Sequence, residues 1–213
     1  MKKYVAEALG TFLLVFCGTG AVVINQQAQG AVTHVGIAIT FGVVVMAIIY
    51  AFGKVSGAHI NPAVSIAFAM TPLFPKKDLI PYIIAQVIGA LLASGVLKWL
   101  FPEATTLGET LPAGSEMQTF VLEIILTYFL MLVIFMVSQN TPEVSQYTAI
   151  AVGGVVLLEA MFAGPISGAS MNPARSIGPA VVKGNLKSLW VYLAAPVIGA
   201  VLATFSWWYF KED

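Results

Sequence analysis

The chain has 213 residues, of which 59% are hydrophobic and only 9% are charged. Soluble domains carry about 25% charged residues, so the twenty charged groups here cannot cover a water-facing surface of this size. The mean hydropathy of +0.90 agrees, and these values predict an integral membrane protein. The absence of net charge or a basic patch excludes a nucleic-acid-binding protein, and the single cysteine excludes a disulfide scaffold.

Six apolar stretches are each long enough to cross a hydrocarbon core of about 30 Å. They predict transmembrane helices over residues 4–24, 34–53, 79–100, 118–138, 147–165 and 187–210. Two further segments, 54–78 and 166–186, are rich in Gly, Ala, Ser and Pro. Both segments are too short to span the membrane and too apolar for ordinary exposed loops.

Lysine positions predict which side of the membrane each loop faces. If the N-terminus is cytoplasmic, the cytoplasmic side holds Lys2, Lys3, Lys54, Lys76, Lys77 and Lys211. The outer side then holds Lys98, Lys183 and Lys187. Because cytoplasmic loops carry the excess of positive residues, both termini are expected on the cytoplasmic side of a cell membrane.

The sequence contains an internal repeat. Residues 56–67, SGAHINPAVSIA, are identical to residues 167–178, SGASMNPARSIG, at eight of twelve positions. The third span matches the sixth equally well, YIIAQVIGALLA against YLAAPVIGAVLA. The chain is therefore expected to be one membrane domain with halves at about 1–105 and 106–213. Each half has three spans, an odd number, so the halves lie upside down relative to each other, as an inverted-topology repeat.

Each repeated box predicts a short helix that begins with Asn-Pro. Asn is a preferred N-cap and Pro is favoured at the first helical position, so helices of about ten residues should start at Asn61-Pro62 and Asn172-Pro173. A helix of this length crosses only half the bilayer, so each segment must enter the membrane and return. Irregular backbone at that depth survives only when buried in protein or lining a water-filled cavity. Both Asn residues are therefore expected near the midplane, facing a pore.

The chemistry of this pore suits a neutral hydroxylic solute. The positive ends of both half-helices would oppose a cation. Each Asn would cap its helix with the side-chain oxygen and leave its amide free to donate to a passing oxygen atom. The extended chains before the two helices would offer carbonyl acceptors, at Gly57, Ala58, His59, Gly168, Ala169 and Ser170.

The duplicated Asn-Pro-Ala boxes, the six spans and a membrane Glu in each half resemble the aquaporin (major intrinsic protein) family. The stretch at 164–180, GPISGASMNPARSIGPA, is most similar to the nodulin-26-like branch. The resemblance implies an all-α membrane protein of six transmembrane helices and two re-entrant half-helices, assembled as a homotetramer with one pore per protomer. It also implies that Glu7 and Glu123 anchor the re-entrant loops. The implied central constriction comprises Asn61, Pro62, Ala63, Asn172, Pro173 and Ala174.

A second constriction is implied around Arg175, three residues after Asn172. An ionisable residue at membrane depth is a functional hypothesis by default, and the alternative is an arginine that reaches the interface. The resemblance implies an outer selectivity filter of Phe41, Ala160, Ala169 and Arg175. Water-selective members resemble one another in placing a His at the Ala160 position, so this filter is expected to be wider. Phe41 could instead be a packed aromatic residue.

Two residues have several interpretations. Glu159 has no counterpart in the other half, and it could pair with Arg175, bind the loop backbone or turn away from the pore. His59 lies in the first re-entrant loop, where a packing role is favoured over a gate.

The sequence favours a passive channel for water and small uncharged solutes, such as glycerol-like polyols or boric and arsenous acid, that excludes ions and protons. The alternatives are a strictly water-selective aquaporin, a secondary transporter, in which inverted repeats also occur, and a scaffolding membrane protein. An enzyme is not expected, because the sequence has no Ser-His-Asp, Cys-His or clustered metal-ligand set. No cofactor or metal is expected either.

Overall fold

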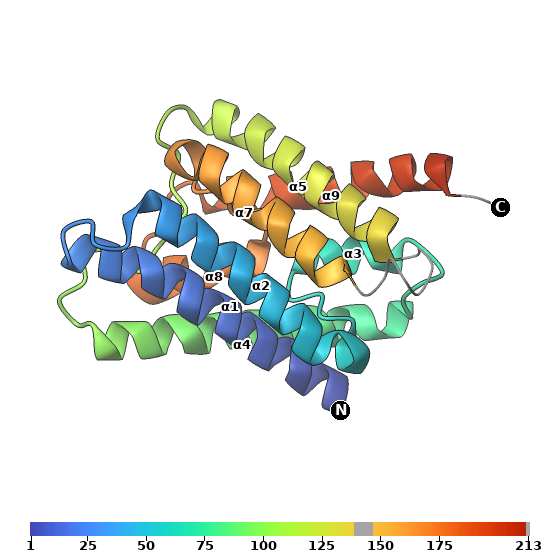
Figure 1. The fold of residues 1–213 in the computed structure, drawn as a ribbon, viewed down its shortest axis with the longest axis horizontal. Helices are drawn as coiled ribbons and strands as arrows, with labels where there is room; N and C mark the ends of the chain where they lie inside the picture. The colour runs from blue at the N-terminus through green and yellow to red at the C-terminus, as the bar shows by residue number, and fades with distance from the viewer. Residues whose placement is uncertain (139–146, 212–213) are drawn as a thin grey trace.

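The structure is a computed structural model that describes residues 1–138 and 147–211. Six of its helices are long and apolar enough to cross a membrane (Figure 1). They are α1 (Lys2–Gln27), α2 (Thr33–Ser56), α4 (Leu79–Leu100), α5 (Glu116–Ser138), α7 (Thr148–Ser167) and α9 (Leu189–Phe210). Every boundary falls within three residues of the predicted span, so the predicted all-α membrane fold is confirmed.

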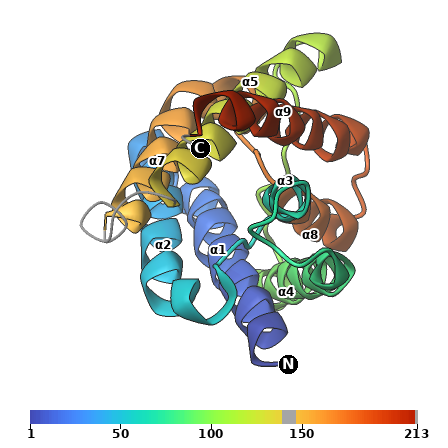
Figure 2. The ribbon, with the colours of Figure 1, turned by 90° about the vertical axis from the view of Figure 1, so that its right-hand side faces the viewer.

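The described residues also form two short α-helices, α3 (Pro62–Ala69) and α8 (Pro173–Lys183), and one turn of 3-10 helix, η1 (Lys76–Asp78). Each of the two α-helices begins with Pro after an Asn in extended conformation, and that Asn accepts a hydrogen bond from the backbone N–H two residues later. The two half-helices contact each other, and both contact α4 and α9. Viewed along the bundle in Figure 2, they lie one behind the other between α4 and α9.

Helix contacts in the first half recur in the second. α1 packs against α2 and α4, and α5 packs correspondingly against α7 and α9, while α2 and α7 join the halves. Glycines permit the closest approaches, because small residues bring membrane helices into backbone contact. A Cβ atom on Gly89 of α4 would lie 2.2 Å from the carbonyl oxygen of Ala8. One on Gly199 of α9 would lie 2.3 Å from the carbonyl oxygen of Ile124.

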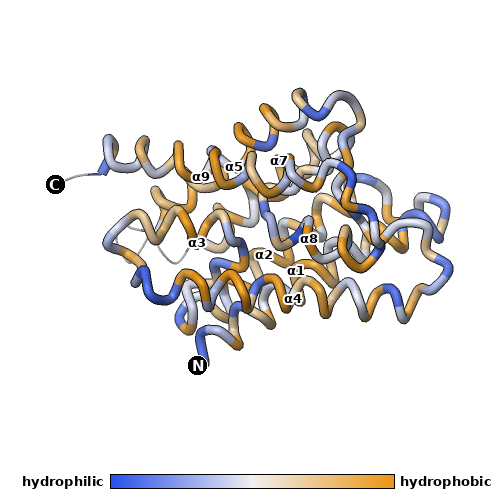
Figure 3. The backbone as a smooth tube through the Cα atoms, turned by 180° about the vertical axis from the view of Figure 1, so that it is seen from behind, coloured by the Kyte–Doolittle hydropathy of each residue, from blue (hydrophilic) through white to orange (hydrophobic). Residues whose placement is uncertain are grey.

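The outer surface is apolar over the length of the long helices. Exposed hydrophobic side chains recur at every fourth position, as in Val5, Leu9 and Leu13 of α1. Figure 3 shows hydrophobic segments along the long helices, with most of the strongly hydrophilic ones near the two ends of the molecule. A band of this kind fits contact with lipid acyl chains. The start of α1 and the end of α9 lie toward the same end of the bundle (Figure 1).

We predict that Gly89→Ala lowers the free energy of unfolding by about 1–3 kcal/mol, since overpacking forces the backbones of α1 and α4 apart. Gly95→Ala is the matched control on the same helix, because a Cβ atom there meets nothing within 4 Å. Thermal unfolding of the purified protein in detergent measures the difference. Equal midpoints for the two variants would contradict the packing argument.

Candidate functional site

The N-termini of α3 and α8 meet inside the protein through their asparagines. The side-chain nitrogen of Asn61 donates to the carbonyl oxygen of Met171 at 2.7 Å, and that of Asn172 donates to the carbonyl oxygen of Ile60 at 2.8 Å. Both asparagines are buried. The expectation that these amides are free is thus wrong for one hydrogen of each, because the two loop carbonyls are buried here and need donors. An amide nitrogen carries two hydrogens, so one donor on each side chain remains.

The loops before α3 and α8 differ from the extended chains expected. Left-handed backbone occurs at Gly57, Ala58 and Ile60 in the first loop, and in the second at Gly168, Ala169 and Met171. For residues with a side chain this conformation costs about 1–2 kcal/mol each. The loops therefore require external contacts that hold them in place.

Glu7 supplies these contacts to the first loop from α1. Its Oε1 accepts hydrogen bonds from the His59 backbone N–H at 2.9 Å and the Ser56 hydroxyl at 2.7 Å. Its Oε2 accepts from the Ile60 backbone N–H at 2.6 Å and from the Gln86 side-chain amide at 2.8 Å. The carboxylate is fully buried and binds two consecutive loop amides, one on each oxygen.

Glu123 of α5 occupies the corresponding place in the second half. Its Oε1 accepts from the Ser170 backbone N–H at 2.9 Å and the Ser167 hydroxyl at 2.7 Å, and its Oε2 from the Met171 backbone N–H at 2.8 Å. The repeat places Pro196 where the first half has a glutamine, so the fourth donor is missing. The serines are functional residues that our sequence reasoning did not single out, although each begins a repeated box.

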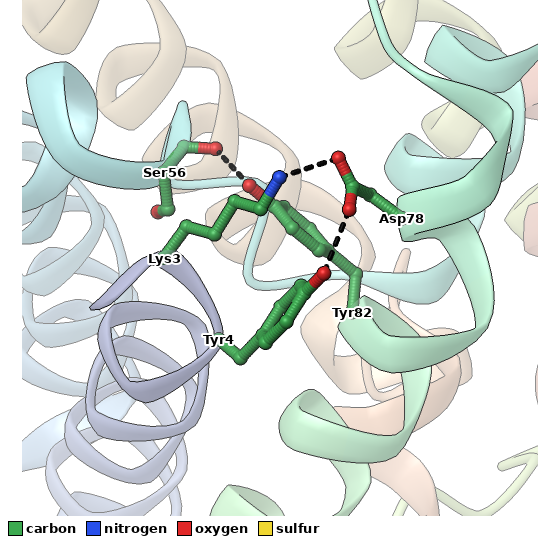
Figure 4. Close-up of polar contacts among 5 residues, drawn as sticks. All are labelled: Lys3, Tyr4, Ser56, Asp78 and Tyr82. Atoms are coloured by element: carbon green, nitrogen blue, oxygen red, sulfur yellow. Dashed lines mark hydrogen bonds and ion pairs between the residues drawn. The ribbon is translucent and has the colours of Figure 1, made fainter. Parts of the chain in front are cut away.

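Figure 4 shows further contacts at the start of the first loop and between the starts of α1 and α4. The Tyr82 hydroxyl donates to the Ser56 carbonyl oxygen at 2.8 Å. Beside it, Asp78 accepts hydrogen bonds from Lys3 at 2.5 Å and Tyr4 at 2.7 Å, which ties the start of α1 to the start of α4. This is the one ion pair formed within residues 1–138 and 147–211.

A cavity of about 120 Å³ runs past both asparagines. Apolar side chains of α1, α2, α5 and α7 form one wall, among them Leu14, Val45, Leu130, Val152 and Val156. The re-entrant loops form the other wall. Of the six residues expected to offer carbonyls, Gly168 does not line the cavity and the rest do, namely Gly57, Ala58, His59, Ala169 and Ser170.

The four residues of the implied outer filter all line this cavity, although they come from four segments: Phe41, Ala160, Ala169 and Arg175. Arg175 is 5% exposed, and its guanidinium carbon lies 5.1 Å from the centre of the Phe41 ring. Gly18 of α1 makes room for that ring, because a Cβ atom there would lie 2.2 Å from Phe41. The arrangement places one cation, one aromatic face and two methyl groups around the cavity.

The structure also shows the surroundings of Glu159 and His59. Glu159 does not line the cavity and forms no ion pair with Arg175 or hydrogen bond with a loop in the described part of the chain, and its Oε2 is buried. Of its three interpretations, the structure therefore favours turning away from the pore. The His59 ring stacks on Phe68 with centroids 4.7 Å apart and contacts Tyr82, as a packing residue does. The described residues contain no group of three His, Cys, Asp or Glu that could hold a metal ion.

Comparisons with known proteins agree on one family. The sequence model of the family described as Major intrinsic protein matches residues 1–207. Aquaporin NIP1-1 of Zea mays is 47% identical over 97% of this chain and 74% of its own length. Nodulin-26 of Glycine max is 45% identical over 94% of this chain and 74% of its own length. The solved structure of the aquaglyceroporin from Plasmodium falciparum is 27% identical, covers 96% of this chain and 93% of that one, and superposes with a TM-score of 0.86.

We predict that Glu123→Leu destabilises the protein, because it leaves the buried N–H groups of Ser170 and Met171 without acceptors at about 1–3 kcal/mol each. Glu123→Gln keeps one acceptor oxygen at nearly the same volume and should cost less. The measurement is the thermal unfolding midpoint in detergent, together with water permeability in vesicles. Equal effects of Leu and Gln would remove the anchoring role.

Proposed function

This chain belongs to the major intrinsic protein family, and on that premise we propose that its pore passes neutral solutes larger than water while excluding ions and protons. The protein is a channel for water and small neutral solutes and not an enzyme. The larger solutes we propose are glycerol-like polyols and metalloid hydroxides such as boric or arsenous acid. The structural neighbour named an aquaglyceroporin supports this choice.

The observation that carries the proposal is the composition of the outer filter. Two of its four side chains, Ala160 and Ala169, are single methyl groups that line the cavity beside Arg175 and Phe41. A ring in place of either methyl would narrow the passage. The open space accommodates a polyol, whose hydroxyl groups accept hydrogen bonds from Arg175 while its carbon side lies against the apolar Phe41 ring.

We propose that the central constriction orients the solute. Of the six residues implied for this constriction, Asn61 and Asn172 line the cavity. Pro62, Ala63, Pro173 and Ala174 do not line it and form the first turns of the two half-helices. The remaining amide hydrogens of Asn61 and Asn172 donate to one passing oxygen, while carbonyl groups of the loops on the same wall accept hydrogen bonds from its hydroxyl hydrogens. The N-termini of α3 and α8 each bring about half a positive charge to this point. A cation therefore meets a repulsive potential in a cavity whose opposite wall is apolar.

The assembly and its membrane placement are further proposals. The apolar outer stripes and the family favour a homotetramer with one pore per protomer. The start of α1 and the end of α9 lie toward one end of the bundle. The lysine excess of that side supports cytoplasmic termini in a cell membrane.

We predict that the purified protein in planar bilayers conducts no ions or protons, because two half-helix dipoles and Arg175 place positive potential along the pore. The same preparation should show water permeability in vesicles, which proves that the protein is active. A cation current that grows with the amount of protein would contradict ion exclusion.

Stopped-flow light scattering on proteoliposomes tests the solute range. We predict that wild-type vesicles pass water, glycerol and boric acid faster than protein-free vesicles. Ala160→His adds a ring and a donor to the filter, so it should reduce glycerol flux much more than water flux. Ala160→Ser is the matched control, because it adds a polar atom with little volume. Wild-type vesicles that pass water but hold back glycerol and boric acid would show that the filter proposal is wrong.

A further inference from the structure

His34, near the start of α2, forms a hydrogen bond with the main chain of α7. Its Nε2 lies 2.7 Å from the carbonyl oxygen of Met161, a residue 127 positions away in the sequence. A carbonyl oxygen only accepts hydrogen bonds, so the ring nitrogen is the donor. Within residues 1–138 and 147–211, this is the one hydrogen bond that joins α2 to α7.

Pro165 explains why this carbonyl group is available to another helix. In an α-helix each carbonyl oxygen accepts a hydrogen bond from the N–H group four residues later. For Met161 that residue is Pro165, which lies inside α7 and has no N–H group. The His34 ring supplies a donor from α2 instead. Gly164 leaves space for the ring, since a Cβ atom there would lie 2.7 Å from its Cε1 atom.

The hydrogen bond lies away from the point where the backbones of α2 and α7 are in contact. A Cβ atom on Gly42 would lie 2.7 Å from the carbonyl oxygen of Gly153, and one on Gly153 would lie 2.5 Å from that of Gly42. His34 precedes Gly42 by eight residues, and Met161 follows Gly153 by eight. Eight residues extend about 12 Å along a helix. The two helices are therefore joined by glycine packing at one point and by a hydrogen bond at another.

Two residues of the proposed filter lie between these points. Phe41 is next to Gly42 and Ala160 is next to Met161, and both filter residues line the cavity. The backbone contact at the glycines fixes the position of Phe41 closely. Ala160 is seven residues beyond Gly153, so its distance from α2 depends on how α7 is held past that contact.

Other hydrogen bonds from outside α7 reach its last two residues. The backbone N–H of Ala113 donates to the carbonyl oxygen of Ile166 at 3.0 Å, and the Ser167 hydroxyl donates to Glu123 at 2.7 Å. These contacts follow Pro165 in the sequence, whereas Ala160 precedes it. In the part of the chain that the structure describes, residues 153–164 form a hydrogen bond with another element only through the His34 ring.

We infer that His34 is a positioning residue for the outer filter: it replaces the donor that Pro165 lacks and so holds Ala160 at its distance from Phe41. The inference rests on the proposed filter. Without the hydrogen bond, the Met161 carbonyl has no protein donor, and this part of α7 moves away from α2 to gain one from water. The space between the two filter residues then widens, which favours glycerol over water.

Three substitutions of His34 test the hydrogen bond in proteoliposomes. His34→Leu keeps a similar volume without the donor, so the ratio of glycerol to water permeability should rise by a factor of about two to five, the scale of one hydrogen bond. His34→Gln places an amide nitrogen near the position of the ring Nε2 and should retain the wild-type ratio. His34→Asn carries the same amide on a side chain one carbon shorter, so it should behave like His34→Leu. An unchanged or lower ratio in His34→Leu, or equal ratios in the two amide variants, would overturn the inference.

Pro165→Ala tests whether the missing helix donor is the reason that His34 matters. The substitution gives this position an N–H group that can donate to the Met161 carbonyl within α7. In that background, His34→Leu should change the ratio little, because the carbonyl no longer depends on the ring. If His34 merely fills the space beside Gly164, His34→Leu acts equally in both backgrounds, and the inference fails. Gly164→Ala, whose methyl group displaces the ring, replaces His34→Leu if that variant does not fold.

Hydrogen exchange of the backbone amides of residues 157–164 measures how firmly α7 is held without reference to any solute. His34→Leu should accelerate this exchange, and Pro165→Ala should remove the difference. Exchange that His34→Leu leaves unchanged would contradict the positioning role. Wild-type vesicles report on the proposed function separately. If they exclude glycerol, that proposal fails, and hydrogen exchange together with water permeability then tests His34 by itself.

Discussion

Every backbone polar group at membrane depth needs a hydrogen-bond partner, and the rest of the structure depends on this constraint. Two segments leave helical structure inside the membrane, at Gly57 and Gly168, and expose loop amides there. No water or lipid tail can satisfy those amides without opening the fold. Glu7 and Glu123 satisfy them instead, each carboxylate binding two consecutive N–H groups from a neighbouring long helix. Since a carboxylate is otherwise costly in a membrane, the loops and the glutamates stabilise each other.

The hydrogen bonds between the loops and the two glutamates also determine which loop groups are left for other partners. Because the loop amides bind carboxylates, the loop carbonyls can accept hydrogen bonds from other donors. Two of those carbonyls, of Ile60 and Met171, accept the asparagine amides of the opposite half. The half-helices are therefore joined across the pseudo-twofold axis by a reciprocal pair of hydrogen bonds. This pair of hydrogen bonds holds the two half-helices together and leaves one amide hydrogen on each asparagine.

Local features of this fold could be predicted from the sequence, and features set by distant contacts could not. The Asn-Pro starts of α3 and α8 were predictable because capping involves only neighbouring residues. The hydrogen bonds that each asparagine donates to the opposite loop could not be predicted. They depend on left-handed backbone at residues such as Ile60 and Met171, a conformation that intrinsic propensity does not favour there. The orientation of Glu159 depends on how α7 is rotated against its neighbours. The hydrogen bond from Arg175 Nη1 to the Gly108 carbonyl oxygen joins residues 67 positions apart, through a loop with no regular structure.

The two halves share one scaffold, but they differ at positions that line the cavity. Three residues after each capping asparagine, the first half has Val64 and the second has Arg175, so the two halves differ in charge at this position. The same position relative to the box is occupied by His59 in one loop and Ser170 in the other. Each contacts a serine of its own half-helix, but His59 also packs into an aromatic cluster, whereas Ser170 connects through Ser176 to the loop between α4 and α5. The first half thus places an apolar side chain and a packed ring at these positions, whereas the second places a cation and a hydroxyl group there.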